Sequence, residues 1–206
     1  MWSYEVGEKA RALGNTFQVN SDVYYESWTN VQQLVDPSCG FGFTSNAGSA
    51  TIYGSEIEIA ANLSSSWMVT QNLGLTHATF DHSIEATNTI KGQKLLDVPN
   101  VTANTSLIYT VPVSDKYNFN ARGVYTYVGP MQDITYTRNN LAGYSLVNLR
   151  AGLAAEKFSA FLFVDNAANK LAVLANNTAQ TVNTPVLNRW VTAHPRTIGI
   201  DLQVRY

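Results

Sequence analysis

Residues 197–206 read Thr-Ile-Gly-Ile-Asp-Leu-Gln-Val-Arg-Tyr, and this stretch decides the fold class. Every second residue is large and apolar or aromatic: Ile198, Ile200, Leu202, Val204 and Tyr206. Successive side chains of a β-strand point to opposite faces of a sheet, whereas a helix returns to the same face only every three to four residues. The alternation therefore predicts a strand with one apolar face and one polar face.

The same alternation recurs upstream and predicts about nine strands in all. The eight others cover residues 3–11, 17–35, 52–63, 67–80, 101–111, 117–128, 145–153 and 158–166. Most are longer than the roughly five or six residues typical of strands in globular proteins. Only residues 167–175 offer a helical alternative. The chain is therefore predicted to be all-β, an antiparallel meander of long strands.

The connections between these strands alternate between short and long. Short turns are expected at residues 12–15, 63–66, 113–116 and 155–157, and long loops at 36–47, 81–98, 129–142 and 167–192. In a meander, every short turn then lies at one end of the sheet and every long loop at the other. Long strands with an apolar face and connections sorted in this way are typical of an outer-membrane β-barrel, because hydrocarbon offers no hydrogen-bond partner to an unpaired backbone.

The composition favours a surface that is poor in ions. Charged residues make up 14% of the 206 residues and the formal net charge is -2, against about 25% charged residues in an average soluble domain. Because no basic cluster is present, nucleic acid is not expected as a partner. Apolar runs such as residues 158–164 are far shorter than the roughly 18 to 20 residues of a membrane-spanning helix. A soluble β-sandwich that binds carbohydrate through its loops is the alternative.

Several short motifs lie in order along the chain. They are SYEVGEK (3–9), NAGSA (46–50) leading into GSEIE (54–58), LDVP (96–99), YSLVNLR (144–150), FVDNA (163–167) and PRTIG (195–199). With this order and spacing, and with the final aromatic Tyr206, the sequence resembles the carboxyl-terminal half of the barrel of TonB-dependent receptors. The resemblance covers essentially the whole chain.

That resemblance implies an outer-membrane protein of a Gram-negative bacterium that takes up a scarce nutrient, such as a ferric siderophore, a vitamin or an oligosaccharide. It also implies a barrel of about 22 strands around an amino-terminal plug domain, which receives energy through the TonB complex. Because bacterial single-chain barrels have even strand numbers, we expect residues 1–206 to form an incomplete sheet, the carboxyl-terminal part of the barrel, with the plug domain and the signal peptide absent.

The resemblance further implies an orientation and a set of partners. The short turns would lie in the periplasm and the long loops outside the cell. Tyr206 would belong to the signal that the barrel-assembly machinery reads. Outer-membrane lipid, the TonB complex (through the missing plug) and a small nutrient ligand are the remaining expected partners.

Candidate ligand-binding residues come from the polar faces of the strands and from the longest loop. They are Glu56, Glu58, Arg122, Arg150, Arg189 and Trp190. Two neighbouring carboxylates can divide the roles of acid and base in catalysis. Alternation alone, however, puts Glu56 and Glu58 on one face, so a solvated polar wall is the favoured interpretation of this pair.

No enzyme activity and no cofactor are expected, because no nucleophile, base and orienting group occur at a recognisable spacing. His77, His82 and His194 are scattered and lack the spacing of metal ligands. Cys39 receives no role. A passive porin-like barrel is a second alternative, which the motifs above disfavour.

Overall fold

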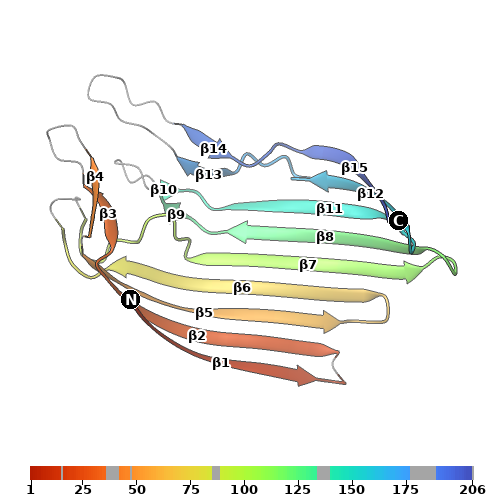
Figure 1. The fold of residues 1–206 in the computed structure, drawn as a ribbon, viewed down its shortest axis with the longest axis horizontal. Helices are drawn as coiled ribbons and strands as arrows, with labels where there is room; N and C mark the ends of the chain where they lie inside the picture. The colour runs from red at the N-terminus through yellow and green to blue at the C-terminus, as the bar shows by residue number, and fades with distance from the viewer. Residues whose placement is uncertain are drawn as a thin grey trace.

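The computed structural model describes residues 1–14, 16–35, 42–46, 48–84, 89–133, 140–176 and 189–205, and within them it contains no helix. Nine long strands form one antiparallel sheet in the order β1-β2-β5-β6-β7-β8-β11-β12-β15 (Figure 1). Their bounds are β1 (Trp2–Ala12), β2 (Phe17–Thr29), β5 (Ser49–Asn62), β6 (Trp67–Phe80), β7 (Val101–Pro112), β8 (Asn118–Val128), β11 (Tyr144–Ala154), β12 (Phe158–Asp165) and β15 (Thr197–Val204). The predicted all-β meander is therefore confirmed.

The connections are sorted as predicted. Four tight turns, after β1, β5, β7 and β11, lie at one end of the sheet, and the longer connections lie at the other end (Figure 1). Three of the long connections carry small hairpins: β3 (Gln32–Val35) with β4 (Phe43–Asn46), β9 (Met131–Gln132) with β10 (Asn140–Leu141), and β13 (Val173–Asn176) with β14 (Trp190–Thr192). Because hairpin turns need few residues, only the loop end of the sheet has chain available for additional structure.

Two details of the sequence prediction are wrong, and Asn residues explain both. The predicted strand 17–35 is broken at Asn30, whose φ of 58 is left-handed, and the chain then enters the β3–β4 hairpin. The helical alternative at 167–175 fails because Asn166 and Asn169 have φ values of 48 and 51. A right-handed helix cannot continue through left-handed residues, and this segment ends in β13.

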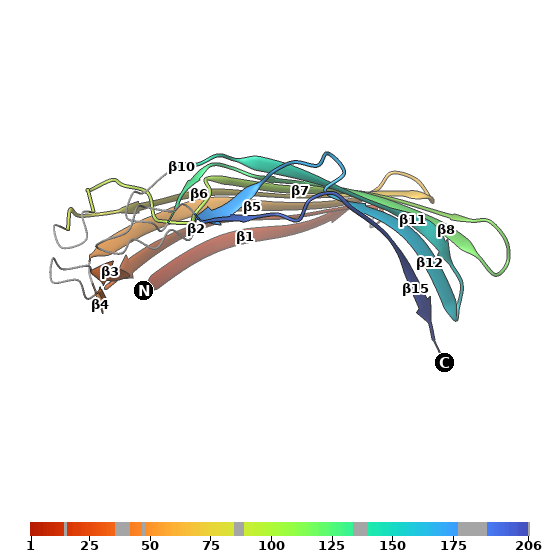
Figure 2. The same cartoon turned by 90° about the horizontal axis from the view of Figure 1, so that it is seen from above.

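The sheet arches from β1 to β15 and does not close (Figure 2). The two edge strands, β1 and β15, do not pair with each other. Besides the nine-stranded sheet, the described residues form only the three hairpins, so no second layer lies over the apolar side of β15. Ile198 is 71% exposed and Leu202 is 65% exposed. The soluble β-sandwich alternative is therefore wrong.

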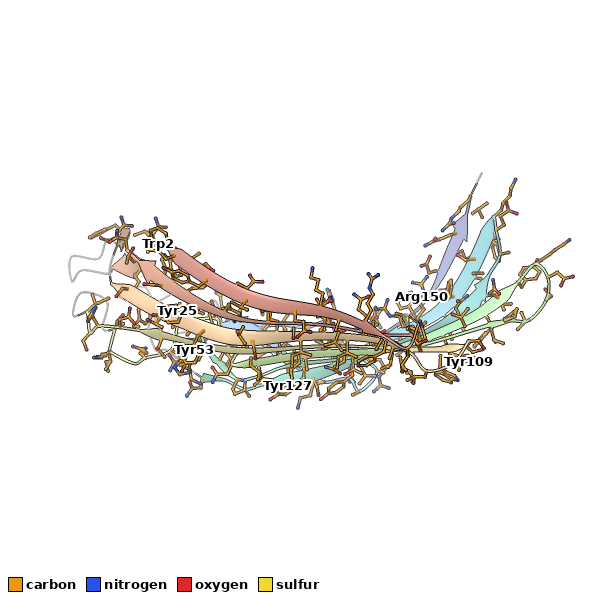
Figure 3. All side chains as sticks on the ribbon, turned by 90° about the horizontal axis from the view of Figure 1, so that it is seen from below. Trp2, Tyr25, Tyr53, Tyr109, Tyr127 and Arg150 are labelled. Carbon is orange, nitrogen blue, oxygen red and sulfur yellow. The ribbon has the colours of Figure 1, made fainter. Side chains whose placement is uncertain are left out.

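Strand register determines which side chains share a face. Residues paired across antiparallel strands point to the same side of the sheet. One row that crosses all nine strands is apolar or glycine throughout: Ala12, Phe17, Ala61, Val69, Leu107, Gly123, Leu149, Val164 and Ile198. Figure 3 shows Tyr109 and Tyr127, which have the same parity as this row, on the convex side, and Arg150 toward the concave side. The convex face is thus the apolar face.

Aromatic side chains lie toward both ends of the convex face. Near the short turns, the rings of Trp67 and Tyr109 are 4.6 Å apart, measured between centroids. Near the long connections, the rings of Tyr53 and His77 stack with centroids 4.8 Å apart, and Tyr25 pairs with Tyr53 across the strands. Between these two aromatic zones the convex face is mostly aliphatic. The polar exceptions include Glu8 on β1 and the hydrogen-bonded pair Thr105 and Gln71 on β7 and β6.

The concave face carries an apolar cluster only near the loop end. Its buried members are Val31, Ala50, Ala78, Phe80 and Leu95. Leu95 belongs to the connection between β6 and β7, and its amide donates to the carbonyl of Ala78 at 2.9 Å. The connection before β7 therefore continues the pairing along β6 beyond the point where β7 begins, and it fixes the loop end of β6.

The close packing of Tyr24 against Gly54 gives a first prediction. A Cβ atom at Gly54 would lie 2.6 Å from Cζ of Tyr24 and would also overlap the carbonyl oxygen of Leu75. We expect Gly54→Ala to lower the free energy of unfolding by about 1–3 kcal/mol, the usual cost of overpacking. Urea denaturation in detergent micelles measures this difference.

The matched control is Gly123→Ala, whose Cβ would meet nothing nearer than Leu149 Cδ2 at 3.4 Å. We expect this variant to unfold at nearly the urea concentration of the unsubstituted protein. Equal destabilisation by the two substitutions would contradict the assigned packing of Tyr24.

Candidate functional site

The middle of the concave face is a row of polar side chains across six strands. Lys9, Asn20, Glu58, Asn72, Asn104 and Thr126 are register partners in turn. Asn20 Nδ2 donates to Glu58 Oε2 at 3.1 Å, and Asn104 Nδ2 donates to Thr126 Oγ1 at 2.9 Å. Such cross-strand pairs hold the polar wall in one arrangement while most of its donors and acceptors still face the concave side.

Glu56 and Glu58 share the concave face, as the alternation predicted. Glu56 lies opposite Asp22 on β2, and both glutamates are exposed. Both glutamates line a hollow of about 290 Å³, together with Asn72 and Thr102 of the next two strands. Exposed carboxylates with amide and hydroxyl neighbours form a solvated acidic patch.

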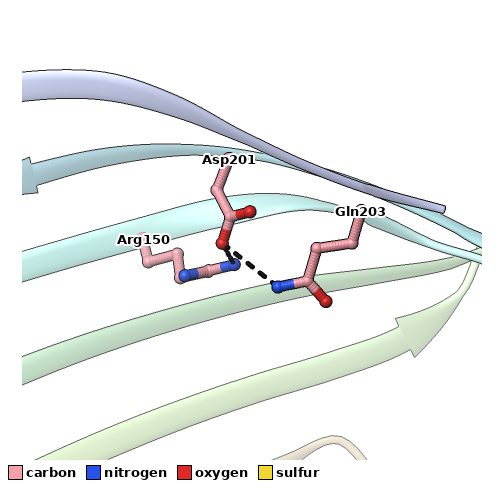
Figure 4. A network of polar contacts seen from close by, with 3 residues as sticks. All are labelled: Arg150, Asp201 and Gln203. Carbon is pink, nitrogen blue, oxygen red and sulfur yellow. Dashed lines mark hydrogen bonds and ion pairs between the residues drawn. The ribbon is translucent and has the colours of Figure 1, made fainter.

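Arg150 and Asp201 form an ion pair on the concave face near the short-turn end (Figure 4). Arg150 Nη2 lies 2.6 Å from Asp201 Oδ2, and Gln203 Nε2 donates to the same oxygen at 3.5 Å. The guanidinium carbon also lies 4.3 Å from the centre of the Phe161 ring. This pair connects β11 to β15 over the intervening strand β12, and the cation–π contact holds the guanidinium flat against the sheet.

Arg122 lies directly opposite Arg150 in the register of β8 and β11. Its Nε donates to Ser106 Oγ at 2.9 Å, and the single ion pair among the described residues leaves Arg122 without a carboxylate. Like charges in opposite positions repel. A groove of about 580 Å³ along these two residues is also lined by Asn120, Ser159 and Gln203. Donors of this kind around two guanidinium groups favour a carboxylate or phosphate anion.

The loop candidates lie apart from the charged residues of the sheet. Trp190 is 50% exposed on β14, where it pairs with Asn176, and Arg189 precedes it and is exposed. The structure does not bring either residue to the Glu56–Glu58 patch or to the Arg122–Arg150 groove. Cys39 and Tyr206 lie outside the described residues, so their predicted places are not tested.

Asn166 is a structural residue whose role was not predicted. It is 4% exposed at the end of β12, and its backbone amide donates to Asn148 Oδ1 at 2.9 Å. Its side-chain amide donates to the carbonyls of Lys170 and His194, each at 2.9 Å, and its Oδ1 accepts from the Lys170 amide at 2.8 Å. One side chain thus joins both ends of the longest loop. The motif at 163–167 contains this residue, but sequence alone does not show the two carbonyls that it binds.

Asp97, in the connection between β6 and β7, has a pKa raised above its usual value. Desolvation is the larger cause and the charge of Asp133 is the smaller one. The Asp97 amide donates to the Gln132 carbonyl at 2.7 Å, so this residue joins two of the long connections. Because the pKa of Asp97 is higher in the folded protein than in the unfolded chain, protonation of Asp97 stabilises the folded state at acidic pH. This stabilisation is lost as the pH rises from the usual pKa of an aspartate through the raised pKa of Asp97.

Neither a metal cluster nor a spanning helix is found in the described part of the chain. Those residues hold no group of three or more His, Cys, Asp or Glu side chains that could bind a metal ion. They also form no helix long and apolar enough to cross a membrane.

The loop junction gives a second prediction. Asn166→Ala removes all three side-chain hydrogen bonds of Asn166 and leaves the Lys170 amide and two carbonyls without this partner. We expect the base of the loop to open more easily, by about 1–3 kcal/mol, the cost of leaving buried polar groups unpaired. Hydrogen exchange at the Lys170 amide measures the opening.

The control is Asn169→Ala, on the exposed side of the same turn. This substitution removes one hydrogen bond, which the Arg196 amide donates to Asn169 Oδ1 at 3.0 Å. We expect faster exchange at Arg196 and little change at Lys170. Unchanged exchange at Lys170 in the Asn166 variant would refute the assigned role.

Comparison with known proteins adds a family and a set of similar folds. A family model described as TonB dependent receptor-like, beta-barrel matches residues 1–167. The ferric yersiniabactin uptake receptor FyuA from Yersinia pestis has a TM-score of 0.78 at 19% identity, over 98% of this chain and 29% of that chain. The copper transporter OprC has a TM-score of 0.76 at 15% identity, over 99% of this chain and 31% of that chain.

A third similar structure is the pyoverdine outer membrane receptor FpvA from Pseudomonas aeruginosa PAO1 bound to pyoverdine. It has a TM-score of 0.69 at 16% identity, over 99% of this chain and 29% of that chain. At these identities the likeness is one of fold. The chain spans less than a third of the length of each of these proteins.

Proposed function

The chain belongs to the TonB dependent receptor-like β-barrel family, and we propose that it is the carboxyl-terminal barrel segment of an outer-membrane receptor for TonB-dependent uptake. One observation carries the proposal: opposite sides of the same nine strands differ in polarity, with one apolar row crossing all nine strands on the convex face and a row of polar side chains crossing six of them on the concave face. This is the arrangement of a wall between hydrocarbon and a water-filled lumen. The family is one of transport receptors, which also argues against a role in catalysis.

The convex face is the lipid-facing side of this wall. Its aliphatic band suits the hydrocarbon core, and the Trp67–Tyr109 and Tyr53–His77 pairs suit the two interfaces, where amphipathic rings are favoured. The short turns would then face the periplasm and the long connections the outside. Tyr206 would be read by the barrel-assembly machinery.

The two open edges are completed by further strands of a longer receptor. An unpaired edge cannot lie in hydrocarbon, because each free amide and carbonyl there costs several kcal/mol. This chain covers 29% of FyuA and 29% of FpvA, which also supports a barrel larger than nine strands. An amino-terminal plug within that barrel would contact the TonB complex.

The concave face and the longest loop contact the nutrient. Six residues are proposed to line its path: Glu56, Glu58, Arg122, Arg150, Arg189 and Trp190. The Arg122–Arg150 groove suits an anionic substrate, because Arg122 has no carboxylate partner among the described residues. Ferric siderophores rank first as the substrate class, since siderophore receptors are among the similar folds. A passive porin is the second candidate, favoured only by the polar lumen wall itself.

The lipid-facing assignment gives a third prediction. Leu107→Arg places a charge at the middle of β7 on the convex face. We expect it to lower folding stability in bilayers by about 2–4 kcal/mol and to reduce the amount of folded protein in the outer-membrane fraction. Asn72→Arg, on the concave face opposite Glu58, is the matched control. It is expected to fold within about 0.5 kcal/mol of the unsubstituted protein. Equal losses in the two variants would argue against a membrane wall.

The uptake proposal gives a fourth prediction. The complete receptor is produced in a bacterium that lacks its own iron receptors, under iron limitation, and is supplied with single ferric siderophores. Growth should require both the receptor and TonB. Arg122→Gln should slow uptake of an anionic siderophore, whereas Arg11→Gln, another cation of the concave face, should not. Growth that persists without TonB would support the passive porin.

A further inference from the structure

A groove of about 500 Å³ runs along the convex face across β7, β8, β11 and β12. Ala121, Gly123 and Ala151 form its floor, and Trp67, Leu149 and Leu162 are among its walls. Ala121 and Ala151 are direct register partners, and Gly123 pairs with Leu149. Small residues in adjacent positions leave the backbone of the sheet without side-chain cover, so the convex face is hollowed here.

The floor of the groove is open toward the surroundings. A Cβ atom built at Gly123 would meet only Leu149 Cδ2, at 3.4 Å. The groove is continuous with the apolar row that crosses all nine strands. Arg122 and Arg150 also border it, but they alternate with its floor and wall residues along β8 and β11 and so belong to the concave face. Hydrocarbon is the occupant that such a surface accepts without leaving a polar group unpaired.

The distance from the short-turn end of the sheet to the groove floor, measured along the membrane normal, matches the thickness of one leaflet. From Tyr117, at the short-turn end, to Gly123 is six residues, or about 20 Å along the strand. At the strand tilt of a membrane barrel, about 35–45°, this corresponds to roughly 15 Å of depth, half of the roughly 30 Å hydrocarbon core. The Trp67–Tyr109 ring pair lies at the same end, where the interface is expected.

Two cations lie where a lipid headgroup would be. Lys116 is in the turn after β7 and Lys157 is in the turn after β11, and both line one hollow at the short-turn edge. Arg205 lines it as a third cation, and the carboxylates Asp115 and Glu156 line it as well, so cations outnumber anions by three to two. The paired strands β8 and β11 carry the groove floor. β8 begins directly after the turn that contains Lys116, and β11 ends directly before the turn that contains Lys157. A phosphate at this edge would therefore meet an ammonium group while its acyl chain extends toward Gly123.

We propose that this groove binds one acyl chain of a phospholipid in the leaflet at the short-turn edge, with the phosphate at Lys116 and Lys157. The inference rests on the proposed function, because it requires the sheet to span a membrane. It goes beyond that function by assigning a defined lipid site to one part of a wall that otherwise contacts lipid along its whole length.

Photochemical labelling tests the site. The complete receptor is reconstituted in bilayers that contain a small fraction of phospholipid with a diazirine in one acyl chain. After irradiation, mass spectrometry maps the labelled peptides. We expect labelling of residues 107–123 and 149–164 to exceed, several-fold, that of the convex face of β2 and β5. Gly123→Leu and, separately, Ala121→Leu fill the groove and should remove this excess. Ala61→Leu, on the convex face of β5, should not.

Each outcome has a separate meaning. Labelling that is even over the convex face in all variants overturns the lipid site and leaves the membrane wall intact. Labelling absent from the convex face overturns the membrane wall itself, and with it the proposed function. Heat-modifiable migration on electrophoresis shows whether each variant has folded, and the two groove-filling variants provide independent tests.

A second arm tests the headgroup. Lys116→Gln together with Lys157→Gln should reduce labelling by the phospholipid several-fold. A diacylglycerol with the same diazirine chain, which has no phosphate, should label the double variant and the unsubstituted receptor equally. An equal response of the two lipids to the double substitution would overturn the phosphate contact.

Discussion

Backbone hydrogen bonding in a medium without water is the constraint on which this structure depends. In hydrocarbon each amide and each carbonyl must find a partner in a neighbouring strand. The described sheet meets this condition for its inner strands with long, in-register pairs, such as the 13 pairs between β2 and β5. It does so with a meander, in which every strand pairs with its neighbour along the chain and hairpin turns need few residues. The edges of β1 and β15 are the places where the condition is not met, which is why a longer barrel is proposed around them.

The same constraint assigns the two faces. Because side chains alternate across a strand, a sheet one layer thick presents two surfaces, and each must suit its own medium. The convex face presents a row of apolar or glycine positions across all nine strands. The concave face presents the Asn20–Glu58 and Arg150–Asp201 pairs. Few residues are needed in a buried core, and the apolar cluster around Phe80 is confined to the loop end. Burial inside the chain therefore contributes less here than in a domain with two packed layers.

Sequence reasoning succeeded where a local pattern determines the outcome. Alternation gave all nine long strands, and turn length gave the sorting of the connections, because both depend on neighbours along the chain. It failed at Asn30, Asn166 and Asn169, where one left-handed residue ends a strand or prevents a helix. It could place Arg122 and Arg150 on polar faces, but not opposite each other, because that depends on the register between β8 and β11, which a long connection joins. The Arg150–Asp201 pair joins residues 51 positions apart across an intervening strand, and no local pattern predicts it.

The Arg122–Arg150 groove and the lipid groove lie back to back on the same two strands. Arg122 lies between Ala121 and Gly123, and Arg150 lies between Leu149 and Ala151, so each cation on the concave face alternates with floor or wall residues of the convex groove. The two grooves are formed by neighbouring register pairs of β8 and β11: Arg122 pairs with Arg150, and Ala121 pairs with Ala151. Because neighbouring side chains project to opposite media, enlarging Ala121 need not move the guanidinium of Arg122, and removing that charge need not fill the convex groove. Anion contact in the lumen and acyl-chain contact in the membrane are therefore separable properties of one short segment of wall, although the backbone that carries them is shared.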